Sequence, residues 1–268
     1  APEILPDDLW NIVEPLIPNK PRRTRFPGRK RIDDRTVLQG ILFVLKTGMP
    51  WEYFPKEMGC SGMTLWRRLR EWMVSGIWQK ILESIIAKLN AAGNIDLSRV
   101  IIEAVPFALF LGVKTGPSPV DRAKNGSKHH ILTDANGTPL VAYTTAANTS
   151  DVTQTLTLVD AIPPIRGKRG RPVQKPKYLL ADRGYDSEPH RDALRARGIT
   201  PVIAKRNTPN GSGLGIVRYV VEQTIGILHQ FRRLRTRYEK SDLIHDAFLQ
   251  AGCIMIGWTR LKKHFVRA

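Results

Sequence analysis

Residues 179–187 read LLADRGYDS, and the rest of the chain is most simply interpreted as the support of this stretch. The apolar run at 178–181 predicts a buried strand, and the turn residue Gly184 follows it closely. Asp182 is therefore expected at the carboxyl end of a strand, where open α/β sheets place their ligands. Two interpretations stay open from this stretch alone: Asp182 contributes to a cation site, or it caps the turn that follows.

The chain carries a large excess of positive charge. Its 268 residues include 42 Lys and Arg against 24 Asp and Glu, a net charge of +18. Residues 99–268 hold 27 of the basic and 13 of the acidic side chains. Such an excess indicates a polyanionic partner rather than a small-molecule substrate.

The cysteine count and the hydropathy of the sequence indicate the cellular compartment. Cys60 and Cys253 are too few for a disulfide framework or a zinc site. No apolar run reaches the roughly 20 residues of a membrane span, and the sequence shows no signal peptide. We therefore expect a cytoplasmic protein that associates with nucleic acid.

The first 95 residues predict a helical domain. Apolar side chains recur at helical spacing in four segments, residues 5–17, 33–46, 61–74 and 76–90. A helix, a connector and a second helix carrying arginines are typical of a helix-turn-helix-like DNA-binding unit. A plain packing or dimerisation module is the alternative.

A basic arm is expected between the first two helices. Residues 20–31 contain seven basic side chains and two prolines, as in arms that follow phosphates or enter a minor groove. A merely solvated loop is the alternative. We predict that the arm and the third helix contact DNA through six arginines: Arg22, Arg23, Arg25, Arg67, Arg68 and Arg70.

A different pattern begins after residue 95 and predicts a second domain at 96–268. Strands are expected at 100–102, 129–133, 140–145, 178–181 and 201–204, and helices at 151–162, 188–197, 217–238 and 241–263. A loop rich in proline and arginine fills 163–177. The order of elements matches the ribonuclease H-like α/β arrangement, a mixed sheet with flanking helices.

Three carboxylates are expected where this sheet meets its helices. Glu103 ends the first strand, Asp182 ends the fourth, and Glu222 lies on an apolar face of the helix at 217–238. A buried acid is costly unless it is paired or bound to metal, and a salt bridge with Arg218 is the alternative for Glu222. We predict that all three acids are catalytic and hold two Mg²⁺ or Mn²⁺ ions, which prefer oxygen ligands. Two such ions about 3.5–4 Å apart can activate an attacking oxygen and stabilise the leaving oxygen of a phosphodiester.

Several blocks of the sequence resemble a known family. They are KTGPSPVDRAKNGSKHHILTDANG at 114–137, LLADRGYDS, and VRYVVEQTIGILHQFRRLRTRYE at 217–239, with PDDLW and GMPWEYFPKEM near the beginning. These blocks resemble the bacterial insertion-sequence transposases of the DDE class, type-five insertion-sequence family, over nearly the whole chain. The resemblance implies a nucleoid-associated DNA transposase that cleaves transposon ends and joins the 3′-hydroxyl to target DNA. It also implies terminal inverted repeats and target DNA as partners, and a homodimer or higher homo-oligomer on DNA.

The resemblance assigns roles to single residues. Asp182 and Glu222 match the second and third acids of the family, and Arg218 matches the basic partner of the third. His229 stands where the family has a further basic residue two turns later. We also predict that seven basic residues line the DNA path near the metals: Lys128, His129, His130, Arg218, His229, Arg232 and Arg233.

Glu103 departs from the family pattern. The family has an aspartate at this place, and Asp121 and Asp134 are weaker candidates for it. The extra methylene extends the carboxylate by about 1–1.5 Å, which metal-site geometry tolerates poorly. The alternative function is therefore a catalytically impaired, transposase-derived DNA-binding protein. A structure-selective nuclease of the same fold is a third possibility.

Overall fold

The fold is built on one mixed β-sheet. The computed structural model describes residues 4–19, 21, 24–26, 28–108, 112–119, 122–207 and 214–265. The strands are β1 (Arg99–Ala108), β2 (Gly116–Pro117), β3 (Asn125–Asp134), β4 (Pro139–Ala146), β5 (Tyr178–Ala181) and β6 (Thr200–Ile203). β3 pairs antiparallel with β1, β2 and β4, whereas β5 is parallel to both β1 and β6. An antiparallel meander followed by two parallel strands is the ribonuclease H-like order, so the predicted fold class is confirmed.

The first strand, β1, is longer than the sequence predicted. The expectation ended the strand at Glu103, but β1 continues to Ala108 and remains paired with β3 throughout. Pro106 lies opposite Lys128 within this extension. β1 pairs with β5 only over Arg99–Ile101, so the proline lies where the other edge of β1 has no described partner strand. Proline tolerates such a position, although it lowers any strand expectation drawn from sequence.

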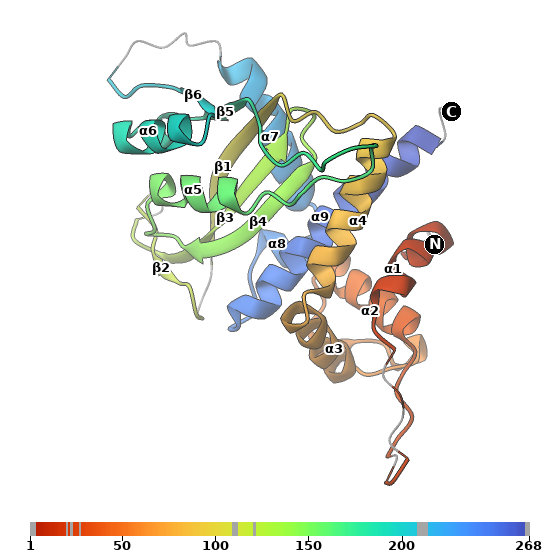
Figure 1. Ribbon diagram of the computed structural model, residues 1–268. Helices are drawn as coiled ribbons and strands as arrows, with labels where there is room; N and C mark the ends of the chain where they lie inside the picture. The colour runs from red at the N-terminus through yellow and green to blue at the C-terminus, as the bar shows by residue number, and fades with distance from the viewer. Residues whose placement is uncertain are drawn as a thin grey trace.

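Helices cover the sheet and form the N-terminal region (Figure 1). They are α1 (Asp7–Val13), α2 (Asp34–Thr47), α3 (Gly62–Val74), α4 (Ile77–Ala91), α5 (Thr155–Asp160), α6 (Glu188–Ala196), α7 (Leu214–Leu228), α8 (Arg232–Arg235) and α9 (Asp242–Phe265), with 3₁₀ turns η1 (Glu14–Leu16), η2 (Trp51–Tyr53), η3 (Lys56–Met58), η4 (Asp151–Gln154) and η5 (Arg183–Tyr185). The predicted helix at 217–238 is wrong as one element, because the chain turns between α7 and α8.

Side-chain caps explain where two N-terminal helices begin. Asp33 accepts a hydrogen bond from the Thr36 amide at 2.9 Å, and Ser61 accepts one from the Thr64 amide at 3.3 Å. The connector between α2 and α3 spans residues 48–61 and contains η2 and η3. It is longer than the ~3–4-residue turn of a helix-turn-helix unit, so the likeness to that motif stays a proposal.

One hydrophobic core runs through the whole chain. It includes Leu9 and Trp78 from the N-terminal helices together with Leu180 and Phe248. α9 packs against both α4 and β4 and so joins the helical region to the sheet (Figure 1). The division at residues 95 and 96 therefore separates two parts that share a core, and it stays a proposal. No helix in the described part of the chain is long and apolar enough to cross a membrane.

Candidate active site

The strand register brings Glu103 and Asp182 together. In the parallel ladder between β1 and β5, Ile101 lies opposite Leu180. Glu103 and Asp182 each follow two residues later, and side chains two apart lie on one face of a strand. The negative charge of Asp182 accordingly contributes to raising the pKa of Glu103. The two acids are therefore neighbours at the edge where β5 ends.

Glu103 is held by an ion pair. Glu103 is buried, with 9% of its surface exposed. Nη2 of Arg218 donates a hydrogen bond to Oε2 of Glu103 at 2.7 Å. Burial raises the pKa of Glu103, and the bond from Arg218 opposes that effect. Burial lowers the pKa of Arg218, but the bond with Glu103 and the charges of Asp182 and Glu222 outweigh it. Glu103 therefore meets a fixed positive charge inside the protein.

Arg218 also contacts the third predicted acid. Its Nη2 lies 3.4 Å from Oε1 of Glu222, one turn further along α7. The Glu222 side chain is 53% exposed, so the expectation that it lies on a buried face of the helix is wrong. The salt-bridge interpretation of Glu222 is therefore confirmed.

Asp182 caps the turn after β5. Its Oδ1 accepts a hydrogen bond from the Gly184 amide at 2.8 Å and begins the 3₁₀ turn η5. The capping interpretation is therefore confirmed. It uses one carboxylate oxygen and is compatible with a second role at the site.

The three predicted acids supply oxygen donors but not the geometry that a divalent cation needs. Carboxylate oxygens are the right donors for Mg²⁺ or Mn²⁺. Within the described ranges, however, no group of three His, Cys, Asp or Glu side chains is placed to hold a metal ion. The structure brings two predicted acids together and sets Arg218 against Glu103 and Glu222. The residues thus fit a divalent cation in kind but not in their present arrangement.

Tyr185 adjoins this site, and sequence reasoning missed it. The residue is 1% exposed, and its hydroxyl has no hydrogen-bond partner among the described residues. Burial raises the pKa of Tyr185 well above its ordinary value, and the charges of Asp151, Glu103 and Asp182 raise it further. Its position three residues after Asp182 is the only signal in the sequence.

The prediction that Lys128, His129 and His130 line the DNA path is wrong about their exposure. All three are buried because β3 is an interior strand, paired on both sides. Lys128 Nζ pairs with Asp151 at 2.8 Å, and His130 Nε2 bonds Thr145 Oγ1 at 2.7 Å.

His129 lies on the face of β3 opposite to Lys128 and His130, because successive side chains of a strand alternate between its two faces. Its Nε2 lies 2.8 Å from Nε2 of His245 on α9, and its ring is 5.9 Å from that of His229. His229 is half-buried, and burial lowers its pKa. The predicted basic residue of the DNA path thus belongs to an internal histidine cluster.

Two arginines predicted to contact DNA are also buried. Arg233 is 3% exposed, pairs with Glu239 at 2.8 Å and donates to the Gly48 carbonyl at 3.1 Å. Arg68 is 5% exposed and pairs with Asp34. These arginines join separate segments of the fold, so the predicted accessibility of both is wrong.

The other residues predicted to contact DNA are accessible or lie outside the described residues. The exposed ones are Arg25, Arg67, Arg70 and Arg232, and Arg218 is half-buried. Arg22, Arg23 and Asp121 lie outside the described residues. Asp134 is buried and accepts bonds from the amides of Asn136 and Thr138, so it shapes the hairpin turn.

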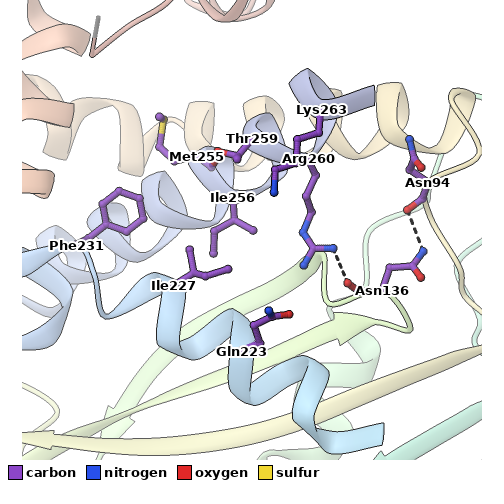
Figure 2. Close-up of a pocket in the computed structure, with 10 residues that line it drawn as sticks. All are labelled: Asn94, Asn136, Gln223, Ile227, Phe231, Met255, Ile256, Thr259, Arg260 and Lys263. Carbon is purple, nitrogen blue, oxygen red and sulfur yellow. Dashed lines mark hydrogen bonds between the residues drawn. The ribbon is translucent and has the colours of Figure 1, made fainter. Parts of the chain in front are cut away.

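A cavity lies away from the acids, between α7 and α9 (Figure 2). It measures about 510 Å³ and is lined by residues that include Gln223 and Ile227 of α7. Figure 2 shows Arg260 reaching the carbonyl of Asn136 across one end. None of the three predicted acids lines the cavity, so it is separate from the candidate site.

Two known families match the chain. The family described as "putative transposase of IS4/5 family" matches residues 5–82, and "transposase DDE domain" matches residues 112–212. Asp182 lies inside the second match, whereas Glu103 and Glu222 lie outside both.

Relatives and solved structures were also found. A putative transposase for insertion sequence element IS402 from Burkholderia cepacia is 65% identical over 150 residues, which cover 56% of this chain and 71% of that protein. A transposase for insertion sequence element IS1106 from Neisseria meningitidis serogroup B is 32% identical over 130 residues, 43% of this chain and 40% of its own length. Among solved structures, the Mos1 transposase paired-end complex with left transposon end matches with a TM-score of 0.36 and 12% identity, covering 93% of this chain and 82% of that one.

Proposed function

Because the chain belongs to the insertion-sequence transposases of the IS4/5 family, we propose that it cleaves transposon ends and joins the freed 3′-hydroxyl to target DNA. The observation that carries this proposal is the placement of Glu103 and Asp182, each two residues beyond the paired residues Ile101 of β1 and Leu180 of β5. Two neighbouring carboxylates at the edge where β5 ends suit a reaction on a phosphodiester.

The proposed cofactor is Mg²⁺ or Mn²⁺, two ions held by Glu103, Asp182 and Glu222. When bound, such ions would polarise the phosphodiester and favour both the attacking and the leaving oxygen. The protein's own contribution is electrostatic: the single positive charge of Arg218 lies against both Glu103 and Glu222 before DNA arrives and offsets part of their negative charge. A DNA phosphate is a strong alternative partner for a guanidinium, so DNA binding would draw Arg218 away and release both carboxylates.

The proposed DNA contacts lie in both parts of the chain. In the proposed N-terminal domain, residues 1–95, exposed Arg25, Arg67 and Arg70 would contact phosphates, with Arg22 and Arg23 of the arm. In the proposed catalytic domain, residues 96–268, the contacts would be made by Arg218 and Arg232. The partners would be terminal inverted repeats and target DNA, bound by a homodimer or larger assembly.

A second function is favoured by one contact. The Glu103 carboxylate, one methylene longer than the family's aspartate, reaches Arg218 at 2.7 Å. If this ion pair persists on DNA, the chain is an impaired transposase that binds DNA without cleaving it.

Cleavage of duplex DNA that carries the element's ends tests the proposal. The wild type should cut with Mg²⁺ or Mn²⁺, and Asp182→Asn should abolish cutting while leaving DNA affinity equal or slightly higher, because one negative charge is removed. Asp192→Asn is the matched control, since Asp192 is an exposed α6 residue whose ion pair is with nearby Arg195, on the same helix and away from the three acids. Equal cleavage by wild type and Asp182→Asn would refute the assignment.

Glu103→Asp separates the two functions. An inactive wild type that this change rescues would identify an impaired enzyme, because the shorter side chain loses Arg218 and regains the family's reach. An active wild type supports the transposase. Cleavage of unpaired ends as fast as paired ends would instead indicate a structure-selective nuclease.

A further inference from the structure

The loop between α5 and β5 holds a dense group of cations. Residues 165–177, here called the basic strap, contain no acidic side chain. The strap carries six basic ones: Arg166, Lys168, Arg169, Arg171, Lys175 and Lys177. None of these belongs to the DNA contacts predicted from the sequence.

The strap is a folded hairpin. Ile165 and Val173 form an antiparallel bridge, with their amides and carbonyls bonded at 2.8 and 3.1 Å. Gln174 Nε2 donates to the Ile162 carbonyl at 2.8 Å and closes the base of the hairpin. The chain reverses between Gly167 and Gly170, which have φ of +104° and +109°.

One side of the strap is docked on α4. Asn90, which is 8% exposed, donates from Nδ2 to the Arg166 carbonyl at 2.7 Å. A Cβ added to Gly167 would come within 2.0 Å of the Ala87 carbonyl oxygen, so the two backbones touch. Ile165 is 3% exposed and belongs to the hydrophobic core. Figure 1 shows this segment crossing from α5 to the end of α4 before it returns to β5.

The cations of the strap remain accessible beside this docked side. All six are exposed, and within the described ranges no carboxylate makes a salt bridge with any of them. Elsewhere in the fold, arginines such as Arg233 are paired internally. Unpaired cations on an ordered backbone repel one another, and binding a polyanion relieves that repulsion.

We propose that the basic strap binds the phosphate backbone of duplex DNA as a surface separate from the catalytic site. The proposal rests on the proposed function, which supplies DNA as the partner. The strap leads directly into β5 at Tyr178, and Asp182 follows the last residue of β5. At ~3.3 Å per residue, the four residues from Tyr178 to Asp182 place the β5 end of the strap about 13 Å from Asp182, close to four base pairs of rise. The strap therefore holds DNA beyond the reacting phosphate.

The first test measures DNA affinity against salt concentration. A labelled duplex of about 30 base pairs is bound by the full chain and by Lys168→Glu with Arg169→Glu. Each lost phosphate contact removes about 0.9 from the slope of log K against log salt, so two lost contacts should flatten it by about 2 and weaken binding roughly 10–100-fold. The control is Lys80→Glu with Lys262→Glu, which makes the same charge change at exposed lysines of α4 and α9.

The second test changes the docking without changing the charge. Gly167→Ala and Gly170→Ala both place a side chain at a positive φ, but only Gly167 would meet Ala87. Gly167→Ala should therefore weaken DNA binding severalfold relative to Gly170→Ala, because the cations lose their fixed position. Thermal unfolding of each variant shows whether it is folded, and the Lys168 and Arg169 variant still decides the matter if Gly167→Ala is not.

The outcomes separate the two proposals. A wild type that binds duplex DNA while the strap and control variants bind equally well, or equally poorly, overturns the strap alone. A wild type with no salt-dependent affinity for duplex DNA overturns both the strap and the proposed function. Selective loss in the strap variant supports the strap even if no cleavage is ever observed.

Discussion

Arg232 and Arg233 are neighbours in sequence with opposite environments, and replacing each by alanine should separate a structural from a surface role. Arg233 is buried and pairs with Glu239, and its guanidinium lies 5.6 Å from the Trp51 ring and 5.0 Å from the Tyr238 ring. Arg232 is exposed. Arg233→Ala should therefore destabilise the fold, whereas Arg232→Ala should leave stability nearly unchanged.

The expected loss of stability in Arg233→Ala comes from the buried Glu239 carboxylate, which loses its partner. Removing one partner of a buried ion pair costs about 3–5 kcal/mol, because an uncompensated charge is left inside. For a chain of this size each kcal/mol lowers Tm by about 2–4 °C, so Arg233→Ala should melt roughly 6–20 °C below the wild type. Arg233→Met with Glu239→Leu removes both charges and should recover most of that loss.

The pH dependence gives an independent check. Burial raises the pKa of Glu239, and the charge of Arg233 opposes that rise. Without Arg233 the folded-state pKa rises further above the unfolded one, so the variant loses stability as pH rises through that folded pKa. The gap between Arg233→Ala and wild type should therefore narrow as pH falls toward 4.5, the ordinary pKa of a glutamate.

Urea or thermal unfolding followed by circular dichroism measures both effects. Unchanged stability of Arg233→Ala, combined with a loss of DNA affinity larger than that of Arg232→Ala, would refute the reasoning. It would mean that Arg233 leaves its pocket to contact DNA.

Two further predictions concern a pair of buried histidines and a pair of helix glycines. Burial holds the pKa of His129 and His245 well below the ordinary value of 6.5, so the unfolded chain takes up protons first and stability should fall as pH drops below that value. Urea midpoints should show this loss, and replacing both by phenylalanine should flatten it; an unchanged slope would contradict the assignment. Gly62→Ala should cost about 1–3 kcal/mol by overpacking, since the new Cβ would lie 1.9 Å from the Trp51 carbonyl oxygen. Gly226→Ala, on an exposed face of α7 with nothing within 4 Å, should add about 0.5–1 kcal/mol, and the reverse ranking of Tm would contradict both estimates.

Local patterns predicted the elements well where one segment carried all the information. The apolar run at 178–181 coincides with β5, because four apolar residues before a turn leave little choice of structure. Ser61 begins α3 as its side-chain cap, as expected. The order of strands and helices then led to the observed sheet, because parallel and antiparallel connections follow from what lies between the strands.

Prediction failed where a distant partner decided the outcome. β1 runs past Glu103 because β3 continues to pair with it, a support that the proline in the strand conceals. Tyr185 was missed because burial and the neighbouring acids that raise its pKa are set by the tertiary structure. The sequence predicted a loop at 163–177 but not the docking of the strap, because its contact with α4 joins segments that are far apart in sequence.

By itself, the sequence determined the class of sheet, the two carboxylates of that sheet and the basic character that points to DNA. Only the tertiary structure decided which cations remain available to a partner and which are neutralised inside. Arg218 meets Glu103 across 115 residues, and Arg233 meets Gly48 across 185. Secondary structure follows from periodicities that a few neighbouring residues carry, whereas the pairing of a charge depends on every segment that the fold brings to it.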